Sequence, residues 1–410
     1  MFPTGKKLIK TAAIALLLTC GFSATASFAL EAADQAKLTR TLNDSLRRMA
    51  DNLHRETGKT LERTGALELQ NKDFYFSGLY PRLAVVDPDG SRLEIGQLSI
   101  NATKASDENN WLLAYAVPST IHKKRAGGQP EYQLTIGNQM FKAAYDGTRN
   151  LFLTGQSRYA DIGFNYADGS KAHIDEITHN HDLSFDETGT KANGSVKLTV
   201  QNISYPTNLA AKDVMAPLFP VSARVNASVA NLPFEKLLAW SKSNTTDLAL
   251  MQQQNSRSPL GFLTSLTQLQ KILTASQTVQ DIKELTLTGT NYEFGFIGTI
   301  EAKENAFYKY VLAGRVRFRG LDTMLAQLSA LPVKTAADRA RRDALQLTLE
   351  TIKPYMVPVS GLTDSYTLEV IIDDKGKIIL NGTDRTIELM GRALQGFLNK
   401  NQAANDSKKP

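Results

Sequence analysis

The sequence has almost no cysteine. Cys20 is the only one among 410 residues, and it lies in the first thirty. If that segment is removed, the chain has no internal disulfide, no thiolate metal site and no cysteine nucleophile. Stability must then come from the burial of apolar side chains, which make up 42% of the composition, a share ordinary for a globular protein.

A large excess of one charge is also missing. Lys and Arg number 47 against 41 Asp and Glu, and three of the lysines, Lys6, Lys7 and Lys10, lie at the N-terminus. Without these three, 44 basic residues stand against 41 acidic ones. This balance argues against a nucleic-acid-binding surface. No apolar stretch after residue 30 reaches the length of a membrane span, so we expect no transmembrane segment once a signal is removed.

The N-terminus predicts export. The three lysines precede a short apolar run at 11–19, and small residues follow it. This order is typical of a secretory signal peptide, which we expect at residues 1–29 and which predicts a periplasmic protein. The segment 17–21 (LLTCG) also resembles a lipoprotein box, so the alternative is a membrane-anchored lipoprotein attached through Cys20.

An amphipathic helix is expected within residues 30–65. One apolar stripe recurs there at spacings of three and four residues. Its members are Leu38, Leu42, Leu46, Met49 and Leu53. Such a stripe usually packs on the body of the protein, and the alternatives are a membrane surface or a partner.

Residues 66–240 predict an antiparallel β domain. Short runs alternate apolar and polar residues, as expected for strands with one apolar face and one wet face. Turn signals divide the runs at Pro88-Asp89-Gly90, Asp146-Gly147, Asp168-Gly169 and Asn193-Gly194. This pattern indicates a meander of hairpins.

The second half mixes strands with helices. We expect a linker at 241–260, rich in Asn, Gln and Ser, then a strand/short-helix domain at 261–398 and a disordered tail at 399–410. A strand, a polar N-cap signal and a short helix are predicted to repeat three times, beginning near Ala223, Gly314 and Ile378. The predicted fold class is mainly β (α+β): an elongated, curved antiparallel meander sheet, partly covered by short helices.

Catalytic signatures are missing. We find no G-x-S-x-G, S-x-x-K, H-E-x-x-H, Walker or G-x-G-x-x-G motif, which favours a protein that is not an enzyme and needs no cofactor. The remaining enzyme hypothesis is a carboxylate-based hydrolase that uses Asp175, Asp373 and Asp374, although nothing indicates that any two of them converge.

One histidine cluster is a candidate metal site. His173, Asp175, His179 and His181 occupy odd positions, which share one face of an extended strand. His179 and His181 are close enough to bind one metal ion, but a third ligand would have to come from a neighbouring strand. The alternative is a solvent-exposed polar face without metal.

An arginine stripe is the other candidate site. Arg315, Arg317 and Arg319 alternate along one predicted strand and could contact phosphate or anionic lipid headgroups. The alternative is a solvent-exposed face of the sheet, or a sheet edge where the charges prevent pairing with further strands. A further basic run at 122–125 indicates a solvated loop.

Three segments carry a resemblance to known families: 312–331, with the run GRVRFRGLDTMLAQLSAL, 366–382 (YTLEVIIDDKGKIILNG) and 142–168 with its Asp-Gly turns. They resemble uncharacterised periplasmic protein families of Gram-negative bacteria with β-meanders like those of AsmA-like envelope proteins. The resemblance implies an elongated curved sheet whose apolar concave face holds acyl chains.

These observations lead to one functional expectation and two alternatives. We expect an exported, periplasmic, non-enzymatic protein of the cell envelope that binds lipid or another apolar ligand along a β-groove. Its partners would be lipid or envelope proteins. The first alternative is an envelope scaffold or interaction module without a small ligand. The second is the carboxylate-based hydrolase.

Overall fold

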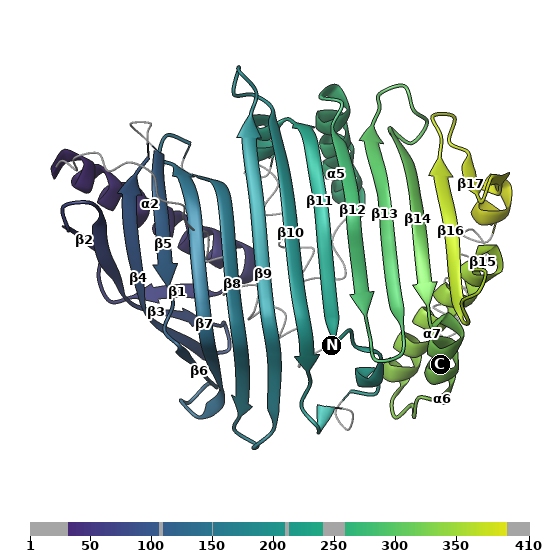
Figure 1. The fold of residues 1–410 in the computed structure, drawn as a ribbon, viewed down its shortest axis with the longest axis horizontal. Coiled ribbons are helices and arrows are strands. Elements are labelled where there is room, and N and C mark those ends of the chain that lie inside the picture. The colour runs from purple at the N-terminus through teal and green to yellow at the C-terminus, as the bar shows by residue number, and fades with distance from the viewer. Residues whose placement is uncertain (1–31, 106–109, 150, 210–212, 241–258, 392–410) are drawn as a thin grey trace.

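The computed structural model describes residues 32–105, 110–149, 151–209, 213–240 and 259–391. These residues form one 18-stranded antiparallel sheet accompanied by helices (Figure 1). The mainly-β prediction is therefore confirmed. The predicted signal peptide, Cys20 and the predicted tail at 399–410 lie outside the described residues, as does nearly all of the predicted linker.

Eleven strands make up the part of the sheet before the gap at 241–258. They are β1 (Thr60–Arg63), β2 (Glu68–Asn71), β3 (Phe76–Val86), β4 (Arg92–Lys104), β5 (Asn110–Ala116), β6 (Thr120–Lys124), β7 (Pro130–Asp146), β8 (Leu151–Tyr166), β9 (Lys171–Phe185), β10 (Ala192–Ser204) and β11 (Ser222–Leu232). The others are β12 (Val279–Thr288), β13 (Glu293–Ala302), β14 (Tyr310–Arg319), β15 (Val357–Pro358), β16 (Ser365–Ile372), β17 (Ile378–Leu380) and β18 (Thr383–Asp384).

Strand order follows chain order over most of the sheet. At one edge β1 and β2 both pair with β3, and β5 and β6 share the position between β4 and β7. From β7 to β14 each strand pairs with the next one in the chain, ending with the pair β13 and β14. At the other end β14 pairs with β16, and helices occupy the intervening chain. This is the predicted meander.

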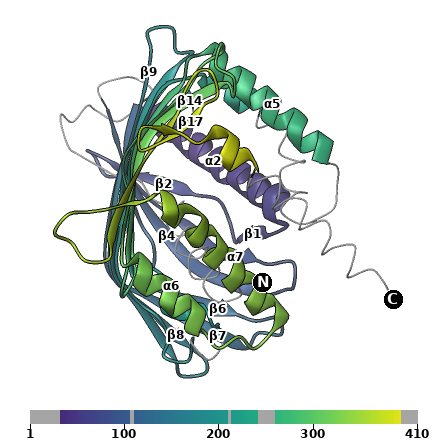
Figure 2. The ribbon, with the colours of Figure 1, turned by 90° about the vertical axis from the view of Figure 1, so that its right-hand side faces the viewer.

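The sheet is curved, and the helices lie on its concave side (Figure 2). They are α2 (Ala32–Thr57), α5 (Pro259–Ala275), α6 (Leu321–Ala330), α7 (Ala336–Ile352) and the short 3-10 turns η1 (Ala216–Leu218) and η2 (Lys353–Tyr355). Residues 234–240 and 386–391 are also helical. The predicted repeat is visible locally, because β11 and β14 are each followed closely by helical residues.

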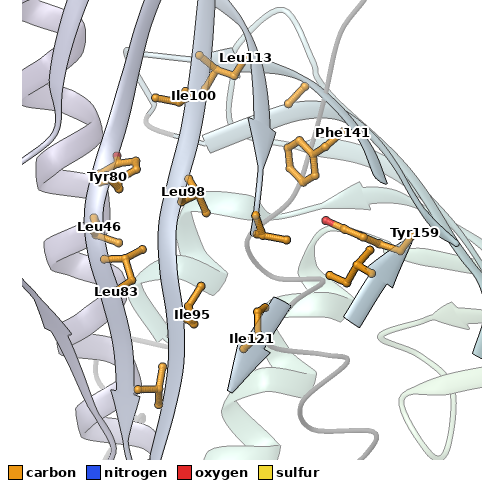
Figure 3. Packing of buried hydrophobic residues seen from close by; sticks show 14 of the residues in the cluster. Leu46, Tyr80, Leu83, Ile95, Leu98, Ile100, Leu113, Ile121, Phe141 and Tyr159 are labelled. Carbon is orange, nitrogen blue, oxygen red and sulfur yellow. The ribbon is translucent and has the colours of Figure 1, made fainter. Parts of the chain in front are cut away.

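Helix α2 covers the first half of the sheet. Leu38, Leu42 and Leu46 are 1%, 2% and 6% exposed, and Met49 and Leu53 pack at the margin of the same cluster. The predicted stripe is thus buried against the protein itself. Each fully buried leucine contributes about 1.5–3 kcal/mol. Figure 3 shows Leu46 beside Tyr80 and Leu83 of β3 in this first core.

A second core lies at the other end of the sheet. Leu321, Met324 and Leu328 of α6 are buried against Phe318 of β14 and Leu368 of β16. Helix α7 adds Leu349, and its N-terminus is capped by Thr335, whose side chain accepts a hydrogen bond from the backbone N–H of Asp338.

The sheet is continuous between the two cores. Strand β11 pairs with β12 from Ser222↔Thr288 to Ala230↔Val279, although the gap at 241–258 lies between them in sequence. The predicted boundary therefore falls between two neighbouring strands of one sheet. The two halves correspond to two hydrophobic cores, not to two sheets.

Two local predictions are wrong. Asn193-Gly194 lies inside β10, and the turn after β9 is formed by Asp186, whose carboxylate accepts the backbone N–H of Thr190 and Lys191. The basic run at 122–125 is mostly strand β6, not a loop. Lys123 is only 8% exposed, because its ammonium pairs with the Asp87 carboxylate and donates to Ser91 Oγ at 3.0 Å.

Candidate functional site

The two faces of the sheet differ in chemistry because side chains alternate along each strand. In β14, Phe318 and Val316 pack into and against the second core, on the concave side. Alternation then places Arg315, Arg317 and Arg319 on the convex side, where all three are exposed. On β14 the concave face is therefore apolar, whereas the convex face carries charge.

A band of inward-facing side chains crosses the concave face from β9 to β14 and joins the two cores. It consists of three rows of cross-strand partners: Ile177, Val200, Ala223, Leu287, Phe294 and Phe318; His179, Leu198, Val225, Leu285, Phe296 and Val316; and His181, Val196, Ala227, Ile282, Gly298 and Gly314. We call this set the concave band. No residue in it carries a formal charge when its two histidines are neutral.

The middle of the concave band is less covered than its ends. Ile177 and Phe318 are each 4% exposed, as expected for members of the two cores. Leu198, Val225 and Leu285, which lie between them, are only half-buried. A half-buried apolar row of this length is a surface on which a hydrocarbon chain gains free energy by leaving water.

A hollow of about 320 Å³ lies beside the band on β9 to β12. Its lining includes Leu183, Gly194 and Val229, which are cross-strand partners. A Cβ built on Gly194 would stand 3.5 Å from Leu183 Cδ1 and 3.6 Å from Val229 Cγ1. The missing side chain at Gly194 therefore deepens the hollow. Phe152 and Gln280 also line it.

A second, smaller hollow of about 130 Å³ lies between α2 and the sheet. Leu46, Tyr80, Leu83 and Leu98, all visible in Figure 3, contribute to its lining. Phe152 of β8 lines both hollows, and its ring lies 5.3 Å from the ring of Tyr145. The two hollows are therefore adjacent, separated by one aromatic side chain.

His179 and His181 are the polar members of the band. Their ring centroids are 5.2 Å apart. Burial lowers the pKa of both imidazoles. The neighbouring His179 lowers the pKa of His181 further, whereas Asp182 and a hydrogen bond with the Phe152 backbone raise it. Both rings are consequently neutral at pH 7.

A serine lies beside this pair. Ser157 of β8 is the direct cross-strand partner of His179 and is 1% exposed. Within the described part of the chain, neither Ser157 Oγ nor His179 Nδ1 has a hydrogen-bond partner, and both atoms are buried. Buried polar atoms usually have a hydrogen-bond partner, so the lack of one at Ser157 Oγ and at His179 Nδ1 requires an explanation.

The expectation that His173, Asp175, His179 and His181 share one face is wrong. Ile174 and Ile177 are both buried in the first core although they are three residues apart, so alternation in β9 is interrupted between them. His173 consequently lies on the opposite face from His179, with its Nε2 3.2 Å from Asp175 Oδ1 and 3.8 Å from Asp161 Oδ1.

This interruption continues across neighbouring strands. Asp161 in β8 and Asn202 in β10, which flank Asp175 in the sheet, have left-handed backbones with φ of 58° and 51°. A Cβ built on Gly137 of β7 would stand 2.7 Å from Asp161 Cβ. The interruption of alternation between Ile174 and Ile177 is therefore shared by several neighbouring strands.

The metal hypothesis keeps only its two first ligands. His179 and His181 lie on the same face, as predicted, but no group of three or more His, Cys, Asp or Glu side chains arranged to hold a metal occurs in the residues that the structure describes. A metal at His179 and His181 would need its remaining ligands from outside the described residues.

The arginine stripe lies away from the band. Arg315 pairs with Glu369 of β16 at 2.5 Å on the convex face. Because Arg317 and Arg319 share this face, the stripe does not line either of the two apolar hollows. Binding of an anion by these three residues stays a prediction, and it would concern a separate surface.

The three carboxylates of the hydrolase hypothesis are not gathered in one cleft. Asp175 lies in β9, where it accepts a hydrogen bond of 2.7 Å from Asn202. Asp373 and Asp374 follow β16, and the Asp373 carboxylate accepts the backbone N–H of Lys375 and Lys377 in its own turn. Asp175 and Asp373 thus each accept structural hydrogen bonds, and Asp175 lies on a different strand from the turn of Asp373 and Asp374.

Sequence reasoning missed Phe152, Ser157 and Gly194. Ser157 was detectable, because it occupies an inward position two residues before the buried Tyr159 in an otherwise alternating run. Gly194 was read as part of a turn, and Phe152 gave no signal of its own.

Comparison of the sequence with known protein-family models gave no match, and comparison with curated proteins gave none either. Among the helices that the structure describes, none combines the length and hydrophobicity needed to cross a membrane.

Proposed function

We propose that this protein is an exported, periplasmic, non-enzymatic protein of the cell envelope that binds the acyl chain of a lipid, or a similar apolar ligand, along the concave band. The observation that carries the proposal is the half-buried apolar row at Leu198, Val225 and Leu285, open between two closed cores and adjacent to the hollow at Gly194. The predicted signal peptide supports the periplasmic location.

The dimensions of the band suit one hydrocarbon chain. Neighbouring strands lie about 4.8 Å apart, so the five spacings from β9 to β14 cover roughly 24 Å. One leaflet of a bilayer has a hydrocarbon thickness of about 15 Å. Each buried methylene contributes about 0.8 kcal/mol. A chain lying across the strands would therefore be held by many small, undirected contacts.

Native mass spectrometry with lipid extraction tests the proposal first. The protein is purified from its own periplasmic or membrane fraction, and a co-purifying lipid near one equivalent is the expected result. A clean apo mass would count against the proposal.

A matched pair of variants locates the site. Val196 points into the concave band and Lys197, its neighbour in β10, points to the convex face. We expect Val196→Trp to fill the hollow and abolish binding of the apolar fluorophore N-phenyl-1-naphthylamine, whereas Lys197→Trp leaves it intact. Equal fluorophore binding by both variants would show that the ligand does not bind to the concave face.

The alternative is an interaction module without a small ligand. The observation in its favour is at the C-terminal end of the sheet, where Ile387, Leu362 and Met390 are 89%, 60% and 55% exposed. An apo mass together with unchanged fluorophore binding in Val196→Trp would favour this function.

A further inference from the structure

We infer that the concave band contains one polar recognition point, formed by Ser157, His179 and His181, which binds an uncharged hydrogen-bonding head group (a hydroxyl or an ester) of the apolar ligand. This inference rests on the proposed function, and it specifies which class of amphiphile the groove accepts.

The first argument is the pairing of two unsatisfied atoms. Ser157 Oγ and His179 Nδ1 belong to directly opposed residues of β8 and β9, and each is buried without a partner among the described residues. An unmet buried donor or acceptor costs free energy, whereas a ligand atom that bonds to it recovers this cost. A hydroxyl group can serve both residues, because it donates once and accepts twice.

The second argument is position. His181 lines the 320 Å³ hollow, and its ring lies beside that of His179. The hydrogen bond between His181 and the Phe152 backbone fixes the orientation of its imidazole. His181 is therefore the member of the polar point that lines the hollow, whereas His179 and Ser157 follow it along β9 and β8, where a chain lying along the concave band would end.

The third argument is charge. The ion pairs of neighbouring strands, such as Arg158 with Glu176 and Arg224 with Glu284, use outward-facing positions. Among the described residues that line the hollow there is no Lys or Arg. Asp182 is in the lining, but it lies between the inward-facing His181 and Leu183, so its carboxylate points to the convex face. An ionised phosphate or carboxylate head group would thus enter a site without a counter-ion, whereas an uncharged group does not meet this penalty.

The test is displacement of N-phenyl-1-naphthylamine by three twelve-carbon amphiphiles: 1-dodecanol, dodecyl phosphate and dodecylamine. We expect 1-dodecanol to compete at about tenfold lower concentration than dodecyl phosphate, as one or two hydrogen bonds can provide. For Ser157→Ala and His179→Phe the ratio of the two competing concentrations, measured against fluorophore binding by the same variant, should fall below about threefold. Asn180→Phe, on the opposite face of β9, is the matched control and should change nothing.

Each outcome separates the inference from the proposed function. Absence of fluorophore binding in the unmodified protein overturns both. Fluorophore binding without preference for 1-dodecanol, or a preference that survives both variants, overturns the inference alone. Stronger displacement by dodecylamine would assign the site to cations and overturn the inference. Micromolar Zn²⁺ binding that His179→Phe abolishes, with 1-dodecanol unaffected, would assign the histidines to a metal. Ser157→Ala keeps the test decisive if His179→Phe does not fold.

Discussion

The carboxylate of Asp364 caps helix α6 at Thr323, 41 residues earlier in the chain. Its Oδ2 accepts hydrogen bonds from the backbone N–H and the hydroxyl of Thr323 at 3.0 and 2.8 Å, and Oδ1 accepts the N–H of Asp322 at 2.7 Å. Gly320, at the N-cap position, has no side chain for this purpose. The loop before β16 thereby holds the helix of the second core in place.

Removal of this cap should destabilise the second core. We expect Asp364→Ala to lower the free energy of unfolding by about 1–2 kcal/mol, because the first turn of α6 loses its acceptors. Asp364→Asn keeps an oxygen and tolerates the left-handed backbone, whose φ is 49°, so its cost should stay below about 0.5 kcal/mol. Urea unfolding measures both, and an equal loss in the two variants would contradict the capping role.

Gly320 should tolerate no side chain. A Cβ built there would lie 2.1 Å from the Asn291 carbonyl oxygen, and φ is 76°. We expect Gly320→Ala to cost more than about 3 kcal/mol. Gly361 has the same φ of 76° but nothing within 4 Å of the built Cβ, so Gly361→Ala should cost only the backbone strain of about 1–2 kcal/mol. Thermal unfolding of Gly320→Ala and Gly361→Ala distinguishes the cost of the steric clash from the cost of the backbone strain.

Asp87 should make the first core sensitive to acid. Burial alone would raise the pKa of its carboxyl, but hydrogen bonds from Lys123, Lys59 and Ser91 outweigh burial and hold the pKa at about 2. The ordinary value is 3.8. A depressed carboxyl pKa stabilises the fold above the unfolded value, and this contribution is lost as the pH falls from about 4 to about 2.

Because the cluster of Asp87 with Lys59 and Lys123 is partly open to solvent, we expect the free energy of unfolding to fall by about 1–2 kcal/mol over this pH range. Asp87→Asn should remove this part of the pH dependence, and its stability should already be reduced at pH 7. Urea unfolding at pH 7 and at about pH 2.5 is the measurement. An unchanged acid dependence in Asp87→Asn would show that other carboxyls are responsible.

His179 and His181 should weaken the fold in mild acid. Burial lowers their pKa values below the ordinary 6.5 in the folded protein. Below pH 6.5 the unfolded chain therefore binds more protons than the folded one, so stability falls as the pH decreases toward the folded values and then levels off. The double variant His179→Phe/His181→Phe should show a flatter stability profile between pH 7.5 and 5. A profile as steep as that of the unmodified protein would contradict this assignment.

The fold could largely be predicted because its signals are local. The stripe from Leu38 to Leu46 lies on one helix, and each strand of the meander shows its own alternation. The candidate site could not be predicted in the same way. The face on which His173 lies depends on a flip shared with Asp161 and Asn202 in neighbouring strands, and one strand's sequence does not contain that information.

Contacts between strands also explain the other differences between the predicted and the observed structure. Asn193-Gly194 matches a hairpin turn in sequence, but Asp186 forms the turn earlier, and Gly194 remains in the strand opposite Leu183. The arginine stripe was predicted correctly as an alternating row, but only the packing of Phe318 and Val316 determines which face it occupies.

The order of the strands has a consequence for how the molecule opens. From β8 to β13 every strand pairs only with its neighbours in sequence, so cooperativity must pass from one core to the other strand by strand, as in a linear array. The half-buried strands β10 to β12 are the weakest connection in this array. Backbone amides there should exchange with solvent through local openings before those of either core. A ligand that lies across these strands would join the two halves into one unfolding unit.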